Sequence, residues 1–403
     1  MALKVGFLDL LGCSRLHLIV LEWGCHDVTL PIALAGVQDG HPCLWGAIAT
    51  TPAVPLVAAR HAKLLPTRRT GLGGQERWWE GKFQGALDAT NQPIAACTDL
   101  RGDRPIYPLS PDHPSSFSSS DRVIDDLKKE RELVLYGGSI YDHFGHLVLD
   151  LTRLYQLLPL FRKSKATFWF HYPALQGMAE IAHPLVLEWL ECLGLQDRVA
   201  LIQREVHCNH LITAEVLYRD RGFVSVDFPV AARQALSPQL RKRLLARTQK
   251  NRRIAYLSRH HLGQGTTRFE GEQEVVEALQ SCANVDVIQP ETLSIEAKLN
   301  LYRDYSMVTG FAQACMNMKY FAPYSQAGEI APQLMFISGP RSLSSNWVNL
   351  ERAAGFGDQV LDCSVSDPAD VVQQQDEPVE GFQRSTRFNA DLLIDTLRSL
   401  DRC

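Results

Sequence analysis

Two arginines and a glutamate stand close together in the second half of this 403-residue chain. Arg259 ends the run RRIAYLSR, Arg268 follows a glycine-containing loop, HHLGQGTT, and Glu272 opens the next amphipathic segment. A guanidinium at the end of a buried strand can hold a phosphate through two parallel hydrogen bonds. As a set, with Ser258, these residues predict a phosphate site. Taken singly, they would be solvated loop charges and a glutamate favoured by a helix dipole.

A second signal for an anion site is the turn after the strand-like run SMVTG. Gly310 ends that run, and FAQACMN begins a segment with a helical pattern. Backbone N–H groups at a helix start can bind an anion without a charged side chain. An ordinary strand-to-helix turn also needs a glycine, so the turn gains weight from its place one βα unit after PETLSIEAKLNLY.

Both signals lie in a series of apolar strands that alternate with amphipathic helices. The helix face of Val275, Val276 and Leu279 and that of Ile295, Leu299 and Tyr302 have helical spacing. The predicted strands are 252–257, 284–289, 306–310, 333–338 and 359–363, and the predicted helices are 271–281, 294–305, 314–321, 346–354 and, near the end, 389–400. This alternation predicts βαβ units around a parallel sheet, with ligands at the carboxyl ends of the strands.

An earlier series has the same pattern. Its predicted strands are 132–140, 166–170, 198–203 and 210–218, and its predicted helices are 142–158, 178–194 with an interruption at Pro184, and a charged helix over 231–250. Two successive α/β units predict two Rossmann-like domains facing a cleft. Before them the chain has short apolar runs broken by Gly, Pro and Asp, which are typical of strands and loops.

The composition along the chain predicts four regions. Residues 1–120 form a β-rich N-terminal extension that ends in the linker PLSPDHPSSFSSS, whose Pro and Ser content is too high for a core element. Residues 121–230 form a first Rossmann-like domain, and residues 231–370 form a second Rossmann-like domain. Residues 371–403 form a C-terminal tail and helix.

The helix predicted over 142–158 carries a second group that could do chemistry. His146 and Asp150 are four residues apart, so both lie on one side of that helix. The pair Gly137 and Gly138 lets the preceding turn bring the helix start close to a ligand. A histidine or a carboxylate of suitable pKa serves as a general base. Alternatively, His146 is a core histidine hydrogen-bonded to a nearby carboxylate.

The order of these motifs resembles glycosyltransferase family 61, the family with capsular polysaccharide transferases and with plant and animal xylosyl-, arabinosyl- and N-acetylglucosaminyltransferases. RRIAYLSR, RFEGE, QPETLSIEAKLNLY and the glycine turn are similar to its C-terminal half. YDHFGHLVLDLTRL is similar to its helix with a histidine, an acidic residue and an Arg-Leu pair, which places His146, Asp150 and Arg153 on the pattern. The resemblance covers Glu132 to Phe356.

The resemblance implies a GT-B-like fold and an inverting transfer from a nucleotide-sugar donor to a glycan or lipid-linked saccharide, in polysaccharide biosynthesis and with no obligatory metal or other cofactor. His146 and Asp150 are the expected catalytic residues. The expected donor-binding residues are Ser258, Arg259, Arg268, Glu272, Gly310, Phe311 and Asn317, and the expected acceptor-side residues are Gly138, His143 and Arg153. Developing charge on the leaving diphosphate would be stabilised by fixed positive groups.

Two positions depart from the family pattern. Phe311 stands where the family has a histidine that contacts the donor, and Gly271 stands where an asparagine often precedes the acidic residue. A second hypothesis is therefore a non-catalytic sugar-nucleotide-binding or scaffolding relative with the same fold. A third is an unrelated two-domain α/β protein, such as an epimerase.

Composition excludes several other classes. The 41 Lys and Arg against 45 Asp and Glu give a net charge of −4, so no bulk positive field attracts nucleic acid. The 10 cysteines are scattered singly, which favours a reducing cytoplasm. Asp9 interrupts the apolar run VGFLDLLGC, so we expect no signal peptide, and no run is long enough to span a bilayer. The expected protein is cytoplasmic, or peripheral at a membrane.

His207, Cys208 and His210 offer three potential metal ligands within four residues. Successive residues of a strand point to opposite faces, and no complementary cluster stands elsewhere in the chain. A structural role is favoured for these three residues, and we expect no metal site.

Overall fold

A computed structural model describes most of the chain from Pro31 onward. The described residues are 31–39, 41–51, 56–69, 82–98, 100–101, 104–105, 133–172, 183–202, 205–246, 252–324, 329–339, 341–365 and 382–401. All of them lie in one compact unit of the chain, residues 31–403. The Pro- and Ser-rich linker predicted before Ser120 lies outside the described residues, and the predicted domain boundaries remain predictions.

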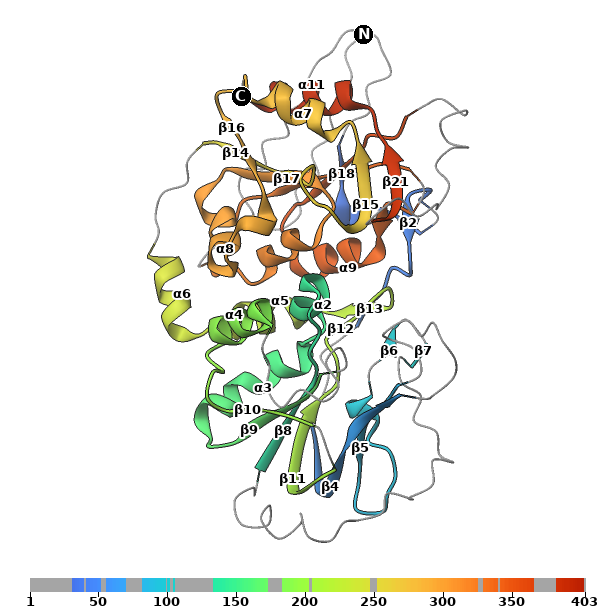
Figure 1. Ribbon diagram of the computed structural model, residues 1–403, viewed down its shortest axis with the longest axis vertical. Coiled ribbons are helices and arrows are strands. Elements are labelled where there is room, and N and C mark those ends of the chain that lie inside the picture. The colour runs from blue at the N-terminus through green and yellow to red at the C-terminus, as the bar shows by residue number, and fades with distance from the viewer. Residues whose placement is uncertain are drawn as a thin grey trace, which may run out of the picture. The chain divides into compact units, whose positions relative to one another are not determined.

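The second α/β series forms a six-stranded sheet in the order β1-β20-β18-β17-β14-β16 (Figure 1). Its strands are β14 (Ile254–Leu257), β16 (Val285–Ile288), β17 (Met307–Phe311), β18 (Gln333–Ile337), β20 (Gln359–Asp362) and the edge strand β1 (Ile32–Ala33). All neighbours except β1 and β20 are parallel. In chain order the five parallel strands have the doubly wound order 2-1-3-4-5, which reverses direction between β14 and β17.

The helices of this series are α7 (Glu272–Leu279), α8 (Ile295–Asp304) and α9 (Ser345–Ala354). The predicted apolar faces of α7 and α8 are confirmed, because their residues are buried. α11 (Ala390–Asp401) packs on α7, with Leu393 and Leu397 in the core cluster that holds Val275 and Leu279. The segment predicted as a helix after β17 is a 3-10 helix, η6 (Ala314–Tyr320).

The first α/β series forms another six-stranded sheet, in the order β10-β9-β8-β11-β4-β5 (Figure 1). Its strands are β8 (Leu133–Ser139), β9 (Thr167–His171), β10 (Val199–Leu201), β11 (Val206–Ala214), β4 (Leu56–Arg69) and β5 (Lys82–Leu87). The four strands β8 to β11 are parallel in the Rossmann-type order 3-2-1-4, and β4 joins β11 antiparallel. The series also contributes α4 (Pro184–Leu193).

The single helix predicted over 142–158 is wrong, since the structure has α2 (Phe144–Leu149) and α3 (Thr152–Lys163). The hydroxyl of Tyr155 donates a hydrogen bond of 2.6 Å to the carbonyl of Val148, the acceptor that a continuing helix would offer to the Thr152 amide. The side-chain oxygen of Thr152 accepts a hydrogen bond from the amide of Leu217. The break ends α2 at Asp150 and lets α3 start in a new direction.

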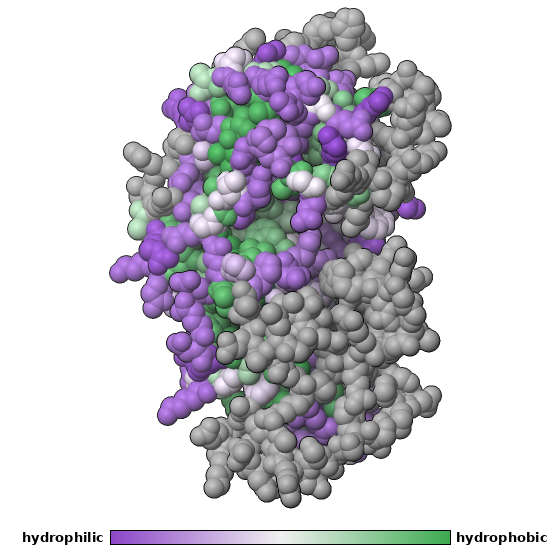
Figure 2. All heavy atoms as spheres, in the orientation of Figure 1, coloured by the Kyte–Doolittle hydropathy of each residue, from purple (hydrophilic) through white to green (hydrophobic). Residues whose placement is uncertain are grey.

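The single charged helix predicted over 231–250 is also wrong. Two helices occupy this region, α5 (Phe228–Ala235) and α6 (Pro238–Leu245). The helical conformation is disfavoured for a residue that precedes a proline, which here is Ser237 before Pro238. The Ser237 hydroxyl also caps α6, because it accepts a hydrogen bond from the amide of Leu240. The surface over α6 is hydrophilic (Figure 2), with Lys242 and Arg243 exposed.

The predicted β-rich N-terminal extension supplies strands to several sheets. In addition to β1, β4 and β5, short strands pair as β2 (Leu44–Trp45) with β19 (Leu343–Ser344), and β3 (Thr50–Thr51) with β13 (Phe223–Ser225). β13 also pairs with β12 (Tyr218–Arg219). β6 (Leu100–Arg101) and β7 (Arg104–Pro105) pair with each other.

The loop predicted between Arg259 and Arg268 ends in a strand, β15 (Gly265–Glu270), which is a difference from the sequence prediction. β15 pairs in parallel with β21 (Phe382–Arg387), and the two strands lie side by side (Figure 1). Side chains also link the two strands. The Glu270 carboxylate on β15 accepts hydrogen bonds from the Ser385 hydroxyl and the Arg387 guanidinium on β21. The predicted C-terminal tail therefore contributes a strand as well as a helix.

One apolar core cluster joins residues of both α/β series. It contains strand residues such as Leu135 and Leu257, and helix residues of both series. At its centre the ring of Phe321, just after η6, lies 5.2 Å from the ring of Tyr155 and 5.1 Å from that of Trp189. The protein is thus a mixed α/β protein with two parallel-stranded sheets, as the sequence predicts.

Candidate active site

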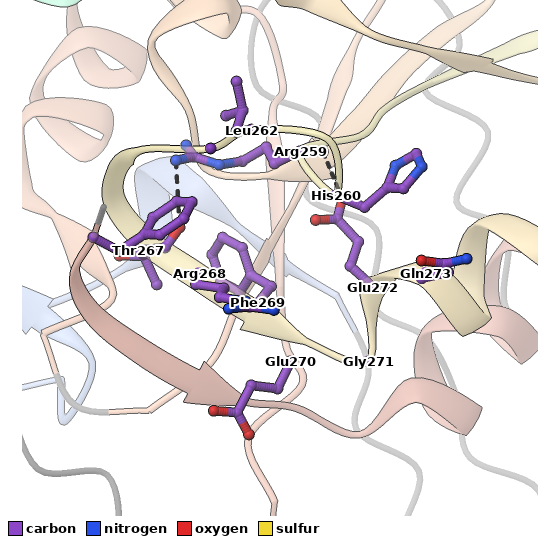
Figure 3. A pocket seen from close by; sticks show the side chains of 12 residues that line it. Arg259, His260, Leu262, Thr267, Arg268, Phe269, Glu270, Gly271, Glu272 and Gln273 are labelled. Atoms are coloured by element: carbon purple, nitrogen blue, oxygen red, sulfur yellow. Dashed lines mark hydrogen bonds between the residues drawn. The ribbon is translucent and has the colours of Figure 1, made fainter. Parts of the chain in front are cut away.

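A cavity of about 520 Å³ opens at the carboxyl end of β14, next to the strand-order reversal between β14 and β17 (Figure 3). It is lined by Arg259, His260, Leu262, Gly263, Thr267, Arg268, Phe269, Glu270, Gly271, Glu272, Gln273 and Phe382. Its volume lies in the range of small-molecule sites. The structure therefore brings Arg259, Arg268 and Glu272 together, as the sequence predicts.

Glu272 fastens the end of β14 to the start of α7. Its Oε1 accepts hydrogen bonds from the Tyr256 hydroxyl at 3.2 Å, the Ser258 hydroxyl at 3.2 Å and the Arg259 amide at 2.8 Å. Burial raises the pKa of Glu272, while these hydrogen bonds and Arg259 act against the rise. Gly271 precedes it with φ +91°, a conformation that suits glycine at this tight strand-to-helix turn.

Ser258 is buried and serves this turn rather than the cavity. Its hydroxyl lies 2.6 Å from Nδ1 of His260 and within reach of Glu272. Burial lowers the pKa of His260, and His261 adds to the effect while Glu291 opposes it. The ring of His260 lines the cavity as a neutral group at pH 7, a residue that the sequence prediction missed.

Arg259 is the most enclosed cation of the cavity. Its Nη2 donates a hydrogen bond of 3.4 Å to the carbonyl of Thr267, and its buried Nε has no hydrogen-bond partner in the part of the chain that the structure describes. Its guanidinium carbon lies 5.9 Å from the centre of the Phe269 ring. Burial lowers the pKa of Arg259, and the carboxylates of Glu272 and Glu291 act in the opposite direction. A guanidinium with an unsatisfied buried N–H is poised to donate to an anionic ligand.

The alternation of side chains along β15 decides which way Arg268 points. Thr267 is buried and Arg268 is exposed, because successive strand residues point to opposite faces. Arg268 lines the outer part of the cavity, so the two arginines approach it from different sides of the ribbon (Figure 3). Phe382 enters the same cavity from β21. The only sequence signal for it is the short strand-like run FQRSTR.

Gly310 and Phe311 lie beside the cavity but do not line it. Gly310 has φ +146°, and a Cβ there would come within 2.7 Å of the Leu257 carbonyl oxygen, so glycine permits the close approach of β17 to β14. Gln313 Nε2 donates to the same carbonyl at 2.9 Å. Phe311 is fully buried, and its ring stacks on that of Phe269 at 3.7 Å between centroids. Its side chain belongs to the core cluster under β15.

Asn317 lies on η6, away from the residues that line the cavity. Its side chain is 4% exposed, and its Oδ1 accepts no hydrogen bond within the described part of the chain. Because η6 is a short 3-10 helix of 7 residues, its aligned backbone dipoles are few. The anion site predicted at this helix start has less support than the arginines of the cavity.

The second predicted group, on α2, is brought together as expected. Nδ1 of His146 lies 2.9 Å from Oδ2 of Asp150, and each side chain is about one-quarter exposed, 27% and 24%. The His143 ring lies 5.2 Å from the His146 ring and the Tyr141 ring lies 5.8 Å from it. Burial lowers the pKa of His143, with His146 adding to the effect and Asp142 opposing it. Asp150 thus holds one ring nitrogen of a partly exposed histidine, which fixes its orientation.

Two predicted acceptor-side residues have structural contacts. Arg153 is 2% exposed, and it donates to the carbonyls of Ala96 and Thr98, each at 2.7 Å, so it fastens the N-terminal region to α3. Gly138 has φ +95°, and a Cβ there would lie 3.3 Å from Nη1 of Arg153. The glycine at position 138 therefore leaves space for the Arg153 guanidinium next to the end of β8.

α2 packs directly on η6, the element that follows β17. A Cβ at Gly145 would lie 3.3 Å from Cβ of Ala314, so the two elements touch closely. The ammonium of Lys298 on α8 lies 5.2 Å from the centre of the Phe144 ring. The Glu188 carboxylate of α4 accepts a hydrogen bond of 2.5 Å from the Ile295 amide at the start of α8. These contacts fasten the helix of His146 to elements of the sheet that carries Arg259.

Within the described residues, no group of three His, Cys, Asp or Glu side chains could hold a metal ion. On β11, Cys208 is buried and donates to the Ala62 carbonyl, while His207 is exposed and lies 2.7 Å from Glu205. The seven cysteines in the described ranges are all buried. No helix there is long and apolar enough to cross a membrane.

The model of the family Glycosyltransferase 61 matches residues 144–325 of the chain. This range contains α2 with His146 and Asp150, the turn after β14, and the stretch from β15 to η6. The match confirms the predicted resemblance and supports a glycosyltransferase assignment. No curated protein matches the chain. Phe382 and β21 lie beyond the matched range.

Proposed function

We propose, from the match of residues 144–325 to Glycosyltransferase 61, that the protein is an inverting glycosyltransferase with a GT-B-like arrangement of its two sheets. It would transfer a sugar from a nucleotide-sugar donor to a glycan or lipid-linked saccharide in polysaccharide biosynthesis. The observation that carries this proposal is the enclosed Arg259 guanidinium in a cavity beside the switch point of a doubly wound sheet. The Nε of this guanidinium has no hydrogen-bond partner among the described residues.

On the donor side, Arg259 and Arg268 would bind the diphosphate. As the bond between the anomeric carbon and the diphosphate oxygen breaks, its electron pair stays on that oxygen, and negative charge grows there. A fixed guanidinium in a partly dehydrated cavity stabilises this charge more strongly than water does. The two arginines would supply the positive charge that a bound metal supplies in other transferases, so we propose a metal-independent reaction.

On the acceptor side, His146 would be the general base. With Nδ1–H donating to Asp150, Nε2 is the basic nitrogen of the ring. The acceptor hydroxyl oxygen attacks the anomeric carbon from the side opposite the leaving diphosphate, and its proton passes to Nε2. One C–O bond forms and one breaks, so the configuration at the anomeric carbon inverts.

A second candidate function is nucleotide-sugar binding without transfer. The burial of Phe311 favours it, because the position of the family's donor-contacting histidine holds an aromatic core residue here. Both candidates predict binding of a nucleotide sugar, and only the first predicts a glycosylated product.

The deciding experiment has two stages. Calorimetry with a panel of nucleoside diphosphates and nucleotide sugars identifies the donor class, and a product assay with saccharide and lipid-linked acceptors then measures transfer, with the anomeric configuration read by NMR. Donor binding without product from any acceptor would favour the binding relative, and conversion of donor without acceptor would indicate an epimerase. Absence of any binding would contradict both proposals.

Arg259→Ala is expected to lower kcat/KM for the donor by at least about 100-fold, as loss of a charge-stabilising donor does in other enzymes. Arg259→Lys should recover only part of this loss, because a point charge replaces a planar fork. Arg253→Ala is the matched control, since Arg253 stands just before β14 and pairs with Asp286 outside the cavity. Equal rates for Arg259→Ala and the control would rule out the assigned role.

A further inference from the structure

The strand β21 brings a cavity residue from far along the chain. Gly265 pairs with Phe382 and Thr267 with Arg384, so the two parallel strands run in register beside the cavity. Ser385 and Arg387 bind the Glu270 carboxylate at 2.7 and 3.1 Å and hold the ribbon together. Because the family match ends at residue 325, this wall of the cavity is built outside the matched region.

The ring of Phe382 and the end of the Arg259 guanidinium both lie next to Gly265. A Cβ at Gly265 would lie 3.1 Å from Nη2 of Arg259 and 3.5 Å from Cε1 of Phe382. The absence of a side chain at Gly265 leaves room for both groups at this position. Phe382 is partly buried and lines the cavity.

Arg259 has few polar contacts that fix its orientation. Toward the residues that the structure describes, its guanidinium makes one long hydrogen bond, to the Thr267 carbonyl, and its Nε makes none. The surroundings of the guanidinium are aromatic: its carbon lies 5.9 Å from the centre of the Phe269 ring, and its Nη2 and the Phe382 ring both lie next to Gly265. An apolar ring beside a cation also excludes water, which strengthens the attraction between that cation and an anionic ligand.

We propose that β21 completes the donor site and that Phe382 is a positioning residue for Arg259. The ring holds the guanidinium in the orientation that meets a diphosphate and keeps water from its outer side. This inference rests on the proposed function, because it needs a diphosphate ligand in the cavity.

The test is calorimetry on the full-length protein with uridine, guanosine, cytidine and thymidine diphosphates. For the diphosphate that binds, Phe382→Ala should raise Kd about tenfold, an effect within the range of couplings between contacting residues. Phe382→Tyr should stay within about twofold of the wild type, since it keeps the ring. Arg398→Ala on α11 is the control, because this exposed side chain lies outside the cavity lining, and it should keep the wild-type Kd.

A double-mutant cycle separates positioning from a general loss of structure. If Phe382 acts through Arg259, the variant with both Arg259→Ala and Phe382→Ala binds no more weakly than Arg259→Ala alone. Additive losses, or a Kd for Phe382→Ala equal to that of the wild type, would overturn the inference while leaving the proposed function intact. A wild-type protein that binds none of the four diphosphates would overturn both. If Phe382→Ala lowers Tm strongly, Phe382→Leu replaces it in the cycle.

Discussion

At the scale of single residues, one helical turn separates His146 from Asp150, and the Asp150 carboxylate holds the histidine ring at Nδ1. Arg153, three residues further along the chain, has a structural role instead. Its partners are the carbonyls of Ala96 and Thr98, more than 50 residues away in the chain. Only the folded structure shows that this guanidinium is used inside the protein.

Asp150→Asn tests the histidine–carboxylate pair. An asparagine can offer either an oxygen or an N–H to Nδ1, so it no longer imposes the tautomer with a basic Nε2. We expect kcat to fall by about 100-fold or more, while Kd for the donor stays unchanged because the donor cavity is not altered. Steady-state rate assays with saturating donor measure kcat, and calorimetry measures the Kd for the donor.

The control for this prediction is Asp197→Asn, which changes an exposed carboxylate outside the site. An Asp150→Asn variant with the same kcat as this control would show that Asp150 does not act through His146. A parallel rise in donor Kd would indicate that the change had spread to the cavity.

At the scale of elements, the sequence predicts most strands and helices of the two α/β series, because burial imposes a clear period on each. It fails where a tertiary contact decides. The Tyr155 hydroxyl binds the Val148 carbonyl, which a continuous helix would use for a backbone hydrogen bond, and α2 ends there. The strand β15 forms because β21, more than 100 residues later in the chain, pairs with it. Local patterns carry no trace of such partners.

The stack of Phe269 on Phe311 holds β15 on the sheet, and it explains why a phenylalanine suits position 311. The Phe311 ring meets Phe269, Phe336 and Phe388, and no polar group is among these ring contacts. A histidine there would bury a polar ring among apolar ones. Position 311, where the resemblance implies a histidine in the family, is therefore part of the core in this chain.

Phe311→His is expected to lower the free energy of unfolding by about 2–4 kcal/mol, from lost packing and a buried polar group, without tightening donor binding. Chemical denaturation and calorimetry measure the two effects. Phe223→His, at a partly exposed ring on β13, is the matched control and should cost less. A Phe311→His variant of normal stability that binds the donor more tightly would show instead that position 311 faces the ligand.

At the scale of the whole molecule, a buried charge cluster ties distant segments together. Lys319 of η6 pairs with Asp358, whose backbone carbonyl accepts from the Leu34 amide in the N-terminal region. Glu351 of α9 accepts from the amides of Gly357 and Asp358. All three side chains are buried, so the cluster holds two carboxylates against one ammonium in a place of low dielectric.

This cluster makes the stability of the whole fold depend on pH. Burial, and then the charge of Asp358, raise the pKa of Glu351 from its ordinary 4.5 to about 7. The folded protein therefore holds a proton that the unfolded chain releases above pH 4.5, and the resulting stability is lost as pH rises through about 7. The expected loss between pH 4.5 and 8 is about 3 kcal/mol, and urea denaturation across this range measures it.

Glu351→Gln should remove this pH dependence, because glutamine resembles the protonated carboxyl at every pH. Its free energy of unfolding should equal or exceed that of the wild type at pH 8, where the wild type carries the uncompensated charge. Glu277→Gln, an exposed change on α7, is the control and should keep the wild-type profile. If Glu351→Gln loses as much stability as the wild type between pH 4.5 and 8, the titrating proton resides on another group. Glu351 would then be ionised over this whole range, because the Lys319 ammonium would balance the charges of both Glu351 and Asp358.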